Sequence, residues 1–382
     1  MSVLDKIEPT LPSAWYYDAD HFRRELEAIW YREWVCVGRL EQVTRPGDYF
    51  VAGIGTQRVI VTRDRDDRLR AFHNTCRHRG STLCTEESGH FANGRIVCPY
   101  HTWTYSLDGE LLATPFRVDS RGFAALDYPL YPVCATAWGG FIFVNLADEP
   151  AQTLAEFLGC EAEELAHWPL AELRSVQQER TRLACNWKLF WENYNECYHC
   201  PRIHPELCRV VPVYKEGIMS PKERPDWRAS DAPEDDWARV GAGVETWTVD
   251  GRSDLPPLAG PDDADRAAGM RFSTFLPSLF VVGHPDYVRS VRVVPCGPES
   301  TDLVVDWYLP PDVAGEHADK IEHMLELGRI VVAQDGRVCE LNQQGLRSRA
   351  HRQGVLVAQE YYLWDFHQWL RRRLCEPQTA EG

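Results

Sequence analysis

Two short segments of the chain, CRHRG and CPYHTW, each place a cysteine close to a histidine. One residue separates Cys76 from His78, and two residues separate Cys98 from His101. Thiolate sulfur and imidazole nitrogen are common ligands of zinc ions and of iron–sulfur clusters. The chain between the segments is long enough to form a strand and a loop that return the second pair to the first. The four side chains are therefore predicted to share one metal centre.

Two metal groups accept two thiolates and two imidazoles. One is a single tetrahedral zinc ion, and the other is a [2Fe-2S] cluster with both cysteines on one iron and both histidines on the other. Zinc fingers with mixed ligands usually pair cysteine with cysteine and histidine with histidine. Here each segment contributes one of each, as a cluster requires if it is to divide its ligand types between two irons. The spacing therefore favours the cluster.

A second pair of histidines, His199 and His204, lies in the segment NECYHCPRIHPEL. On an unbroken helix, side chains five residues apart are rotated by about 140° and cannot share a metal ion. Pro201 is predicted to break the helix between them, so that His204 turns back toward His199. Two histidines and one carboxylate, with other positions open, are typical of non-haem Fe(II) that reacts with O2. These residues alone leave a zinc site and two unrelated polar side chains equally open.

Longer stretches around these motifs, CPYHTWTYSLDGEL and WGGFIFVNL among them, resemble the large (α) subunit of the Rieske-type ring-hydroxylating oxygenases. The resemblance extends over nearly the whole chain. It implies a Rieske [2Fe-2S] cluster and a mononuclear Fe(2+) ion as cofactors, with O2 as co-substrate. In the family, a late helix donates an aspartate to the iron, and the matching residue is in VVAQDGRVCELNQQGL. The implied cluster ligands are Cys76, His78, Cys98 and His101, and the implied iron ligands are His199, His204 and Asp335.

The resemblance also implies a catalytic role for Glu196, three residues before His199. In the family, an acidic residue at this place hydrogen-bonds a cluster histidine of the neighbouring subunit in a head-to-tail trimer. A homotrimer in which each cluster serves the iron of the next chain is therefore expected. Glu192, Asn193 and Tyr198 flank the same segment and are candidates for orienting the iron ligands.

Electrons are expected from a separate NAD(P)H-dependent flavin and iron–sulfur reductase, because the chain has neither a GxGxxG motif nor a four-cysteine ferredoxin pattern. Within the family, ENYNECYHCPRIHPELC, ETWTVDGRS and TFLPSLFVVGHPDYV resemble the branch that oxidises small quaternary ammonium compounds such as glycine betaine, stachydrine and carnitine. Hydroxylation or N-demethylation of such a substrate is the expected reaction. Hydroxylation of an aromatic acid by a mono- or dioxygenase is the alternative. A Rieske electron-transfer protein and a zinc-stabilised binding module are the alternatives from other classes.

A methylammonium substrate would need aromatic rings around its charge, because cation–π attraction is what holds such a group. Aromatic residues of these segments could form that cage. The candidates are Trp191, Tyr194, Trp247, Phe272 and Phe275.

Composition excludes several other classes. The formal net charge is −16, with 57 acidic and 41 basic residues, so the protein repels nucleic acids and anionic lipid surfaces. The 13 cysteines are irregularly spaced in a chain too long for a disulfide-stapled miniprotein, and most are expected to be free thiols in a reducing compartment. The segment MSVLDKIEPT lacks the basic region and apolar core of a signal peptide, and no stretch is apolar enough to span a membrane. A cytoplasmic protein without a membrane partner is expected.

The pattern of apolar residues predicts an α+β protein in three parts. Residues 1–34 form a helical lead-in, in which Asp18 or Asp20 caps a helix. Residues 35–150 contain short apolar runs broken by turns, which are typical of a small antiparallel β domain, here the Rieske domain. Residues 151–382 form a larger catalytic domain, and the resemblance implies an antiparallel sheet covered by helices, of the helix-grip type. Residues 220–265 are predicted to be a long loop with one strand-like stretch, VETWTV.

Overall fold

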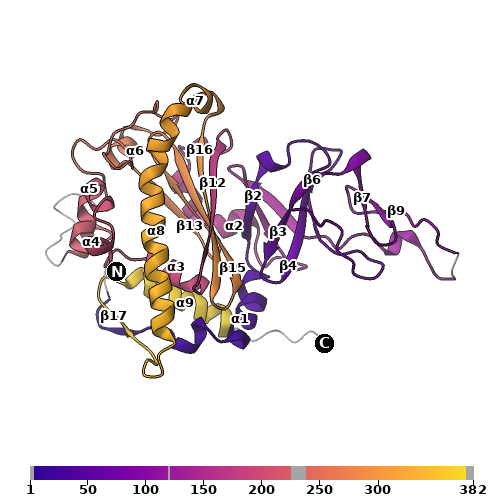
Figure 1. Ribbon diagram of the computed structural model, residues 1–382, viewed down its shortest axis with the longest axis horizontal. Helices are drawn as coiled ribbons and strands as arrows, with labels where there is room; N and C mark the ends of the chain where they lie inside the picture. Colours follow the sequence, from indigo (N-terminus) through magenta and orange to yellow (C-terminus); the bar gives the residue numbers. More distant parts are fainter. Residues whose placement is uncertain (1–3, 119–120, 225–237, 376–382) are drawn as a thin grey trace. The chain divides into compact units, whose positions relative to one another are not determined.

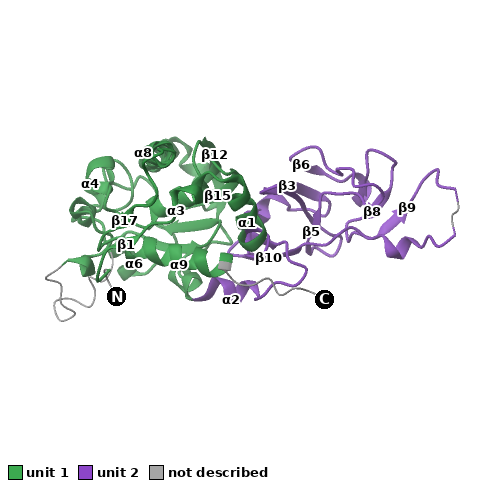
Figure 2. Cartoon of the chain, turned by 90° about the horizontal axis from the view of Figure 1, so that it is seen from below, with its two compact units in different colours: residues 1–29, 160–382 green, residues 30–159 purple. Residues whose placement is uncertain are grey.

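The computed structural model describes residues 4–118, 121–224 and 238–375 of the chain, in two compact units (Figure 2). One unit combines residues 1–29 with residues 160–382, and the other comprises residues 30–159. All pairings between the described strands are antiparallel, and helices accompany the largest sheet. The predicted α+β class is therefore confirmed.

The unit of residues 30–159 consists of three small sheets. Gly55 lies in the tight turn between two paired strands and has a φ of 56°, which favours glycine. A core of aliphatic and aromatic side chains, with Ile96 and Tyr105 fully buried, packs beneath the loops that carry the cysteine–histidine segments. The sheets are formed by β10 (Cys134–Trp138), β11 (Phe141–Asn145) and β2 (Val35–Arg39); by β5 (Leu69–His73), β4 (Gln57–Arg63), β3 (Asp48–Ile54) and β6 (Ser88–His90); and by β7 (Arg95–Val97), β8 (Thr104–Ser106) and β9 (Leu111–Ala113).

The other unit is built on a five-stranded antiparallel sheet crossed by a long helix, α8 (Ile321–Leu346) (Figure 1). The helix packs closely because glycines face the sheet: a Cβ on Gly336 would lie 2.8 Å from a methyl carbon of Leu183. Earlier in the same helix, a Cβ on Gly328 would lie 3.2 Å from the ring of Trp307. The strands follow the order β12 (Arg174–Leu183), β16 (Ser300–Leu309), β15 (Val288–Gly297), β14 (Leu279–Gly283) and β13 (Arg271–Phe275).

Helix α3 (Trp187–Tyr194), which leads into the second histidine pair, is fixed by a buried ion pair. Lys188 Nζ donates to Glu25 Oε1 at 2.5 Å and to Asn186 Oδ1 at 2.7 Å, and both charged side chains are fully buried. Removing one partner of such a pair typically costs about 3–5 kcal/mol of the free energy of unfolding. Glu25 ends α1 (Ala19–Glu25), whose first turn is capped by Asp18, as predicted.

One sequence-based assignment is wrong. VETWTV does not form a strand, because the hydroxyls of Thr246 and Thr248 bond to Asp286 and to the Arg252 carbonyl within a turn-rich loop. Part of the predicted loop, residues 225–237, lies outside the described residues. No helix within the described ranges is long and apolar enough to cross a membrane.

Candidate active site and metal centres

The two cysteine–histidine segments form neighbouring loops of the 30–159 unit. Cys76 and His78 follow β5, and Cys98 and His101 lie between β7 and β8. The two Nδ1 atoms of His78 and His101 are 3.2 Å apart, and their rings meet edge to face. Both cysteines are buried, at 3% and 1% exposure, whereas His78 is exposed. The structure thus brings all four residues together, with the thiols inside and the imidazoles toward solvent.

This donor set fits a [2Fe-2S] cluster held by two thiols on the inner side and two imidazole Nδ1 atoms on the outer side. The Tyr105 hydroxyl, 3.2 Å from Cys76 Sγ, adds a hydrogen-bonding group of the kind that adjusts cluster potentials. The nearby Cys84 is a buried free thiol, and burial raises its pKa to about 12. Cys84 therefore stays protonated and packs in the hydrophobic core of this unit.

In the other unit, three candidate ligand atoms converge. His204 Nε2 lies 2.8 Å from Asp335 Oδ1 and 3.2 Å from His199 Nε2, and the third separation, His199 Nε2 to Asp335 Oδ1, is 3.5 Å. Ligand atoms at right angles around one ion, each about 2.1 Å from it, are about 3 Å apart. The three groups therefore fit one face of a metal ion.

Each imidazole of this site is oriented through its other nitrogen. His199 Nδ1 lies 2.5 Å from Glu196 Oε1, and His204 Nδ1 lies 2.7 Å from Gln334 Oε1. Since carboxylate and amide oxygens only accept, both Nδ1 atoms carry the proton and both Nε2 atoms are left for a metal. Gln334 precedes Asp335 on α8. This one helix therefore supplies the ligand candidate Asp335 and the residue that orients His204.

The chain path around the two histidines differs from the prediction. Helix α3 already ends at Tyr194, before His199, and Pro201 does not break a helix. Instead, Pro201 lies in the first turn of α4 (Cys200–Ile203). Backbone N–H groups in the first turn of a helix have no partner within the helix, so proline costs no hydrogen bond there. His199 and His204 flank this single turn and face each other from its two ends.

The other flanking residues have different positions. Asn193 Nδ2 lies 3.3 Å from His199 Nε2 and thus contacts the site. Glu192 faces away, because its carboxylate accepts from the Tyr16 hydroxyl and lies 2.9 Å from His367 Nε2. Tyr198 is 57% exposed.

Charge at the site favours a cation. Burial would raise the pKa of Asp335, but hydrogen bonds from the two histidines outweigh it and lower the pKa. For His199, burial opposes the protonated form, yet Asp335 and Glu196 raise its pKa to about 9. A metal ion that binds here would displace that proton, because imidazole ligates metals in its neutral form.

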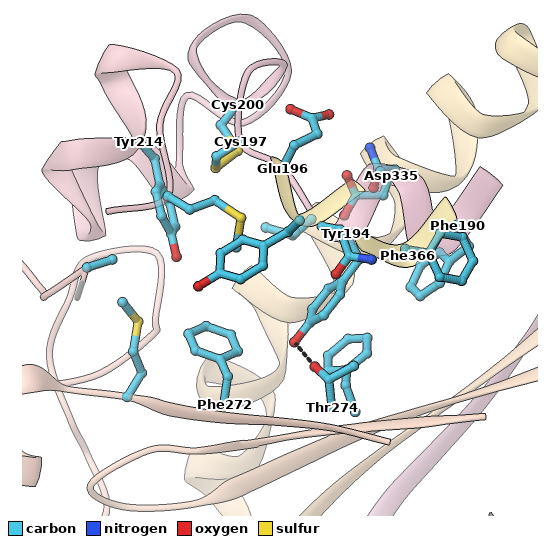
Figure 3. A pocket seen from close by; sticks show the side chains of 18 of the residues that line it. Phe190, Tyr194, Glu196, Cys197, Cys200, Tyr214, Phe272, Thr274, Asp335 and Phe366 are labelled. Atoms are coloured by element: carbon cyan, nitrogen blue, oxygen red, sulfur yellow. Dashed lines mark hydrogen bonds between the residues drawn. A yellow bond between two sulfur atoms is a disulfide. The ribbon is translucent and has the colours of Figure 1, made fainter. Parts of the chain in front are cut away.

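The three converging residues line a cavity of about 530 Å³ (Figure 3). Of the cage candidates, Tyr194, Trp247 and Phe272 line this cavity. Trp191 and Phe275 do not: the Trp191 indole donates to the Pro277 carbonyl, and Phe275 is packed in the core at 2% exposure. Further aromatic residues that line the cavity were not identified from the sequence. These are Phe190, Tyr214, Phe280, Tyr362, Phe366 and Trp369.

Cys197 and Cys200, on either side of His199 in the sequence, form a disulfide (Figure 3). Cys200 Sγ lies 3.9 Å from His199 Nε2. As a disulfide sulfur it offers no thiolate, so it does not compete with Asp335 as a ligand. The remaining described cysteines are free thiols, as predicted for most of them.

Other known proteins share both units. The sequence matches the Rieske [2Fe-2S] domain over residues 33–125 and the ring hydroxylating alpha subunit (catalytic domain) over residues 170–376. The glycine betaine monooxygenase oxygenase subunit of Chromohalobacter salexigens is 33% identical, over 98% of this chain and 87% of the relative. The chloroplastic choline monooxygenase of Spinacia oleracea is 29% identical, over 96% of this chain and 78% of its own.

Among solved structures, a quaternary ammonium Rieske monooxygenase superposes with a TM-score of 0.75. The two chains are 23% identical, and 96% of each is covered. That structure was described for carnitine oxidation by gut microbiota and for inter-subunit electron transfer. At this identity the likeness establishes the fold.

Proposed function

This chain belongs to the α-subunit family of the Rieske-type ring-hydroxylating oxygenases, and we propose that it is the oxygenase component that removes an N-methyl group from a small quaternary ammonium compound. The observation that carries the proposal is the convergence of His199, His204 and Asp335 on an aromatic-lined cavity. Relatives named for glycine betaine and choline support the substrate class.

The residues would hold the two cofactors of this family. Cys76, His78, Cys98 and His101 are proposed as cluster ligands, within a Rieske domain at residues 35–150. His199, His204 and Asp335 are proposed as ligands of the mononuclear Fe(2+), within a catalytic domain at residues 151–382. The helical lead-in, residues 1–34, precedes both.

When bound, the iron supplies O2 activation and the cluster supplies electrons one at a time. One oxygen atom enters an N-methyl C–H bond, and the other leaves as water with two electrons and two protons. The resulting N-hydroxymethyl group separates as formaldehyde and leaves the tertiary amine. The chain's own residues position the site: Glu196 and Gln334 keep the two imidazoles turned toward Asp335, and the aromatic rings line the cavity in which the substrate would lie.

Tyr194, Phe272 and Phe280 would face the methylammonium group. The ring of Tyr194 stacks on that of Phe280, with centroids 4.1 Å apart. The Thr274 hydroxyl donates to the Tyr194 hydroxyl at 3.5 Å, so the ring is held at the cavity wall (Figure 3). A cation over such desolvated rings gains about 1–2 kcal/mol. Uncharged isosteres of the substrate would lose this attraction.

The assembly and the electron source are also proposed. A homotrimer would allow Glu196 to link a cluster histidine of one chain to His199 of the next. A separate flavin and iron–sulfur reductase would deliver electrons from NAD(P)H. A cytoplasmic location agrees with the many free thiols of the described residues.

Purified protein with an NADH-dependent reductase tests the function on a panel of betaines and aromatic acids. Betaines are expected to stimulate NADH oxidation and to release formaldehyde, while uncharged isosteres bind more weakly by about 1–2 kcal/mol. Tight coupling to an aromatic acid would instead favour ring hydroxylation. A red-brown protein without the extra mononuclear iron would favour an electron-transfer protein. A colourless protein that contains zinc would exclude both N-demethylation and ring hydroxylation.

A further inference from the structure

One buried charged side chain of the cavity has no hydrogen-bond or ion-pair partner among the described residues. Arg289, on β15, lines the same cavity as Asp335 and is 4% exposed. Its Nε is buried without a hydrogen bond, and across the described residues Arg289 forms no ion pair. Its one ring contact is with Trp247, whose centroid lies 5.8 Å from the guanidinium carbon.

An unpaired guanidinium at this depth is costly, because burial removes its hydration. Burial lowers the pKa of Arg289 for the same reason. Asp335 is the one carboxylate that acts on it electrostatically, and that carboxylate is already bonded to His199 and His204. A weak contact with one indole ring does not replace the lost hydration. The missing anion must therefore come from the contents of the cavity.

The surroundings of Arg289 are suited to an oxygen-bearing ligand. Gly328 lets α8 pack closely against Arg289, since a Cβ there would lie 3.3 Å from both Arg289 Nη1 and Trp307 Nε1. The indole nitrogens of Trp307 and Trp247 are themselves buried donors without partners. Arg289 and Trp307 are cross-strand neighbours on β15 and β16. Unused donors thus cluster around the guanidinium.

We infer that Arg289 binds the carboxylate of the substrate, and that the substrate is a zwitterionic betaine rather than a purely cationic alcohol such as choline. This inference rests on the proposed function and narrows it. A guanidinium matches a carboxylate with two parallel hydrogen bonds. A substrate with a positive charge alone would bring a second cation into a cavity that already holds Arg289. The same side chain therefore selects for betaines and against choline.

Anaerobic titration calorimetry on the metal-loaded protein tests this with three probes: glycine betaine, its carboxamide and choline. The carboxamide has the size of glycine betaine but no negative charge. The wild-type protein is expected to bind glycine betaine at least about tenfold more tightly than the other two. Arg289→Gln should weaken glycine betaine binding about 10- to 100-fold and change carboxamide binding less than about threefold. Arg289→Lys should restore part of the difference.

Arg271→Gln is the matched control, because Arg271 lines the same cavity but already pairs with Asp265 at 3.2 Å. It should leave the ratio between glycine betaine and its carboxamide unchanged. Equal binding of the two probes by the wild type overturns the inference even if neither Arg289 variant folds. Equal weakening of both probes by Arg289→Gln also overturns it. If both probes bind equally and both release formaldehyde, the proposed function is supported and the proposed role of Arg289 is wrong. If no quaternary ammonium compound is oxidised, the proposed function itself is wrong.

Discussion

Asp335→Ala is expected to abolish product formation while the visible spectrum of the [2Fe-2S] cluster stays that of the wild type. The proposed iron site loses its one carboxylate, and the cluster segments belong to the other compact unit. Because removing even an outer partner of a metal ligand costs about 10- to 100-fold, the rate should fall below about 1%. Formaldehyde release, iron content and the cluster spectrum measure the three expectations.

Glu340→Gln provides the matched control on the same helix. The Glu340 carboxylate accepts a hydrogen bond from the Ala184 backbone N–H. It is not one of the three groups proposed to hold the iron. This variant should retain near-wild-type activity and its mononuclear iron. Near-normal activity of Asp335→Ala, or loss of activity in Glu340→Gln alone, would mean that another carboxylate completes the site.

Mixed trimers are expected to regain activity from two kinds of inactive chain. Cys98→Ser removes a cluster ligand and Asp335→Ala removes an iron ligand, so each variant alone should be inactive. In a head-to-tail ring formed from equal amounts of both, about one quarter of the interfaces join an intact cluster to an intact iron. Activity should therefore recover to about a quarter of the wild-type value per chain. Co-expression followed by formaldehyde assay measures it.

Glu196 is the residue that such a transfer would require. Its carboxylate holds His199 Nδ1 at 2.5 Å and also accepts from the backbone N–H groups of Tyr198 and His199. Adding Glu196→Ala to the Cys98→Ser chain, which carries the working iron, should remove the recovery even after the variant is reloaded with Fe(2+) to the iron content of the Cys98→Ser chain. The same substitution in the Asp335→Ala chain is the control and should leave the recovery intact. Mixed trimers that stay inactive with both metals loaded would show that electrons do not cross between subunits.

The meeting of the two cysteine–histidine segments could be predicted from the sequence because the information for it is local. Each of the two loops carries one cysteine and one histidine, and short turns with bonds from Gly80 N to the Cys76 carbonyl and from Thr102 N to the Cys98 carbonyl fix them. Tyr105 was missed as a partner of Cys76, since a tyrosine on a short strand gives no sign of where its hydroxyl points.

The convergence of His199, His204 and Asp335 was predicted for a partly wrong reason. The family resemblance led to Asp335, but the explanation based on Pro201 was wrong. Helix α3 ends at Tyr194, five residues before His199, and Pro201 lies in the separate helix α4. Gln334 and Arg289 could not be identified, because their roles depend on how α8 and β15 pack, and long-range packing leaves no periodic signal in either segment.

The aromatic lining illustrates the same limit. On β13, Phe272 and Thr274 line the cavity, whereas Ser273 and Phe275 are buried on the opposite side, as the two-residue period of a strand requires. Phe272 and Phe275 therefore lie on opposite faces of the strand, although both were candidates for the same aromatic cage. Which face borders the cavity is decided by the order of the strands in the sheet, which the sequence pattern does not reveal.

A single turnover shows whether oxidation of the substrate is coupled to oxidation of the cluster. The protein is reduced, freed of reductase, mixed with glycine betaine and exposed to O2, and formaldehyde is compared with the loss of the reduced-cluster EPR signal. About one formaldehyde per mononuclear iron is expected, formed together with cluster oxidation and absent without the betaine. Cluster oxidation without formaldehyde, or formaldehyde without cluster oxidation, would contradict this expectation.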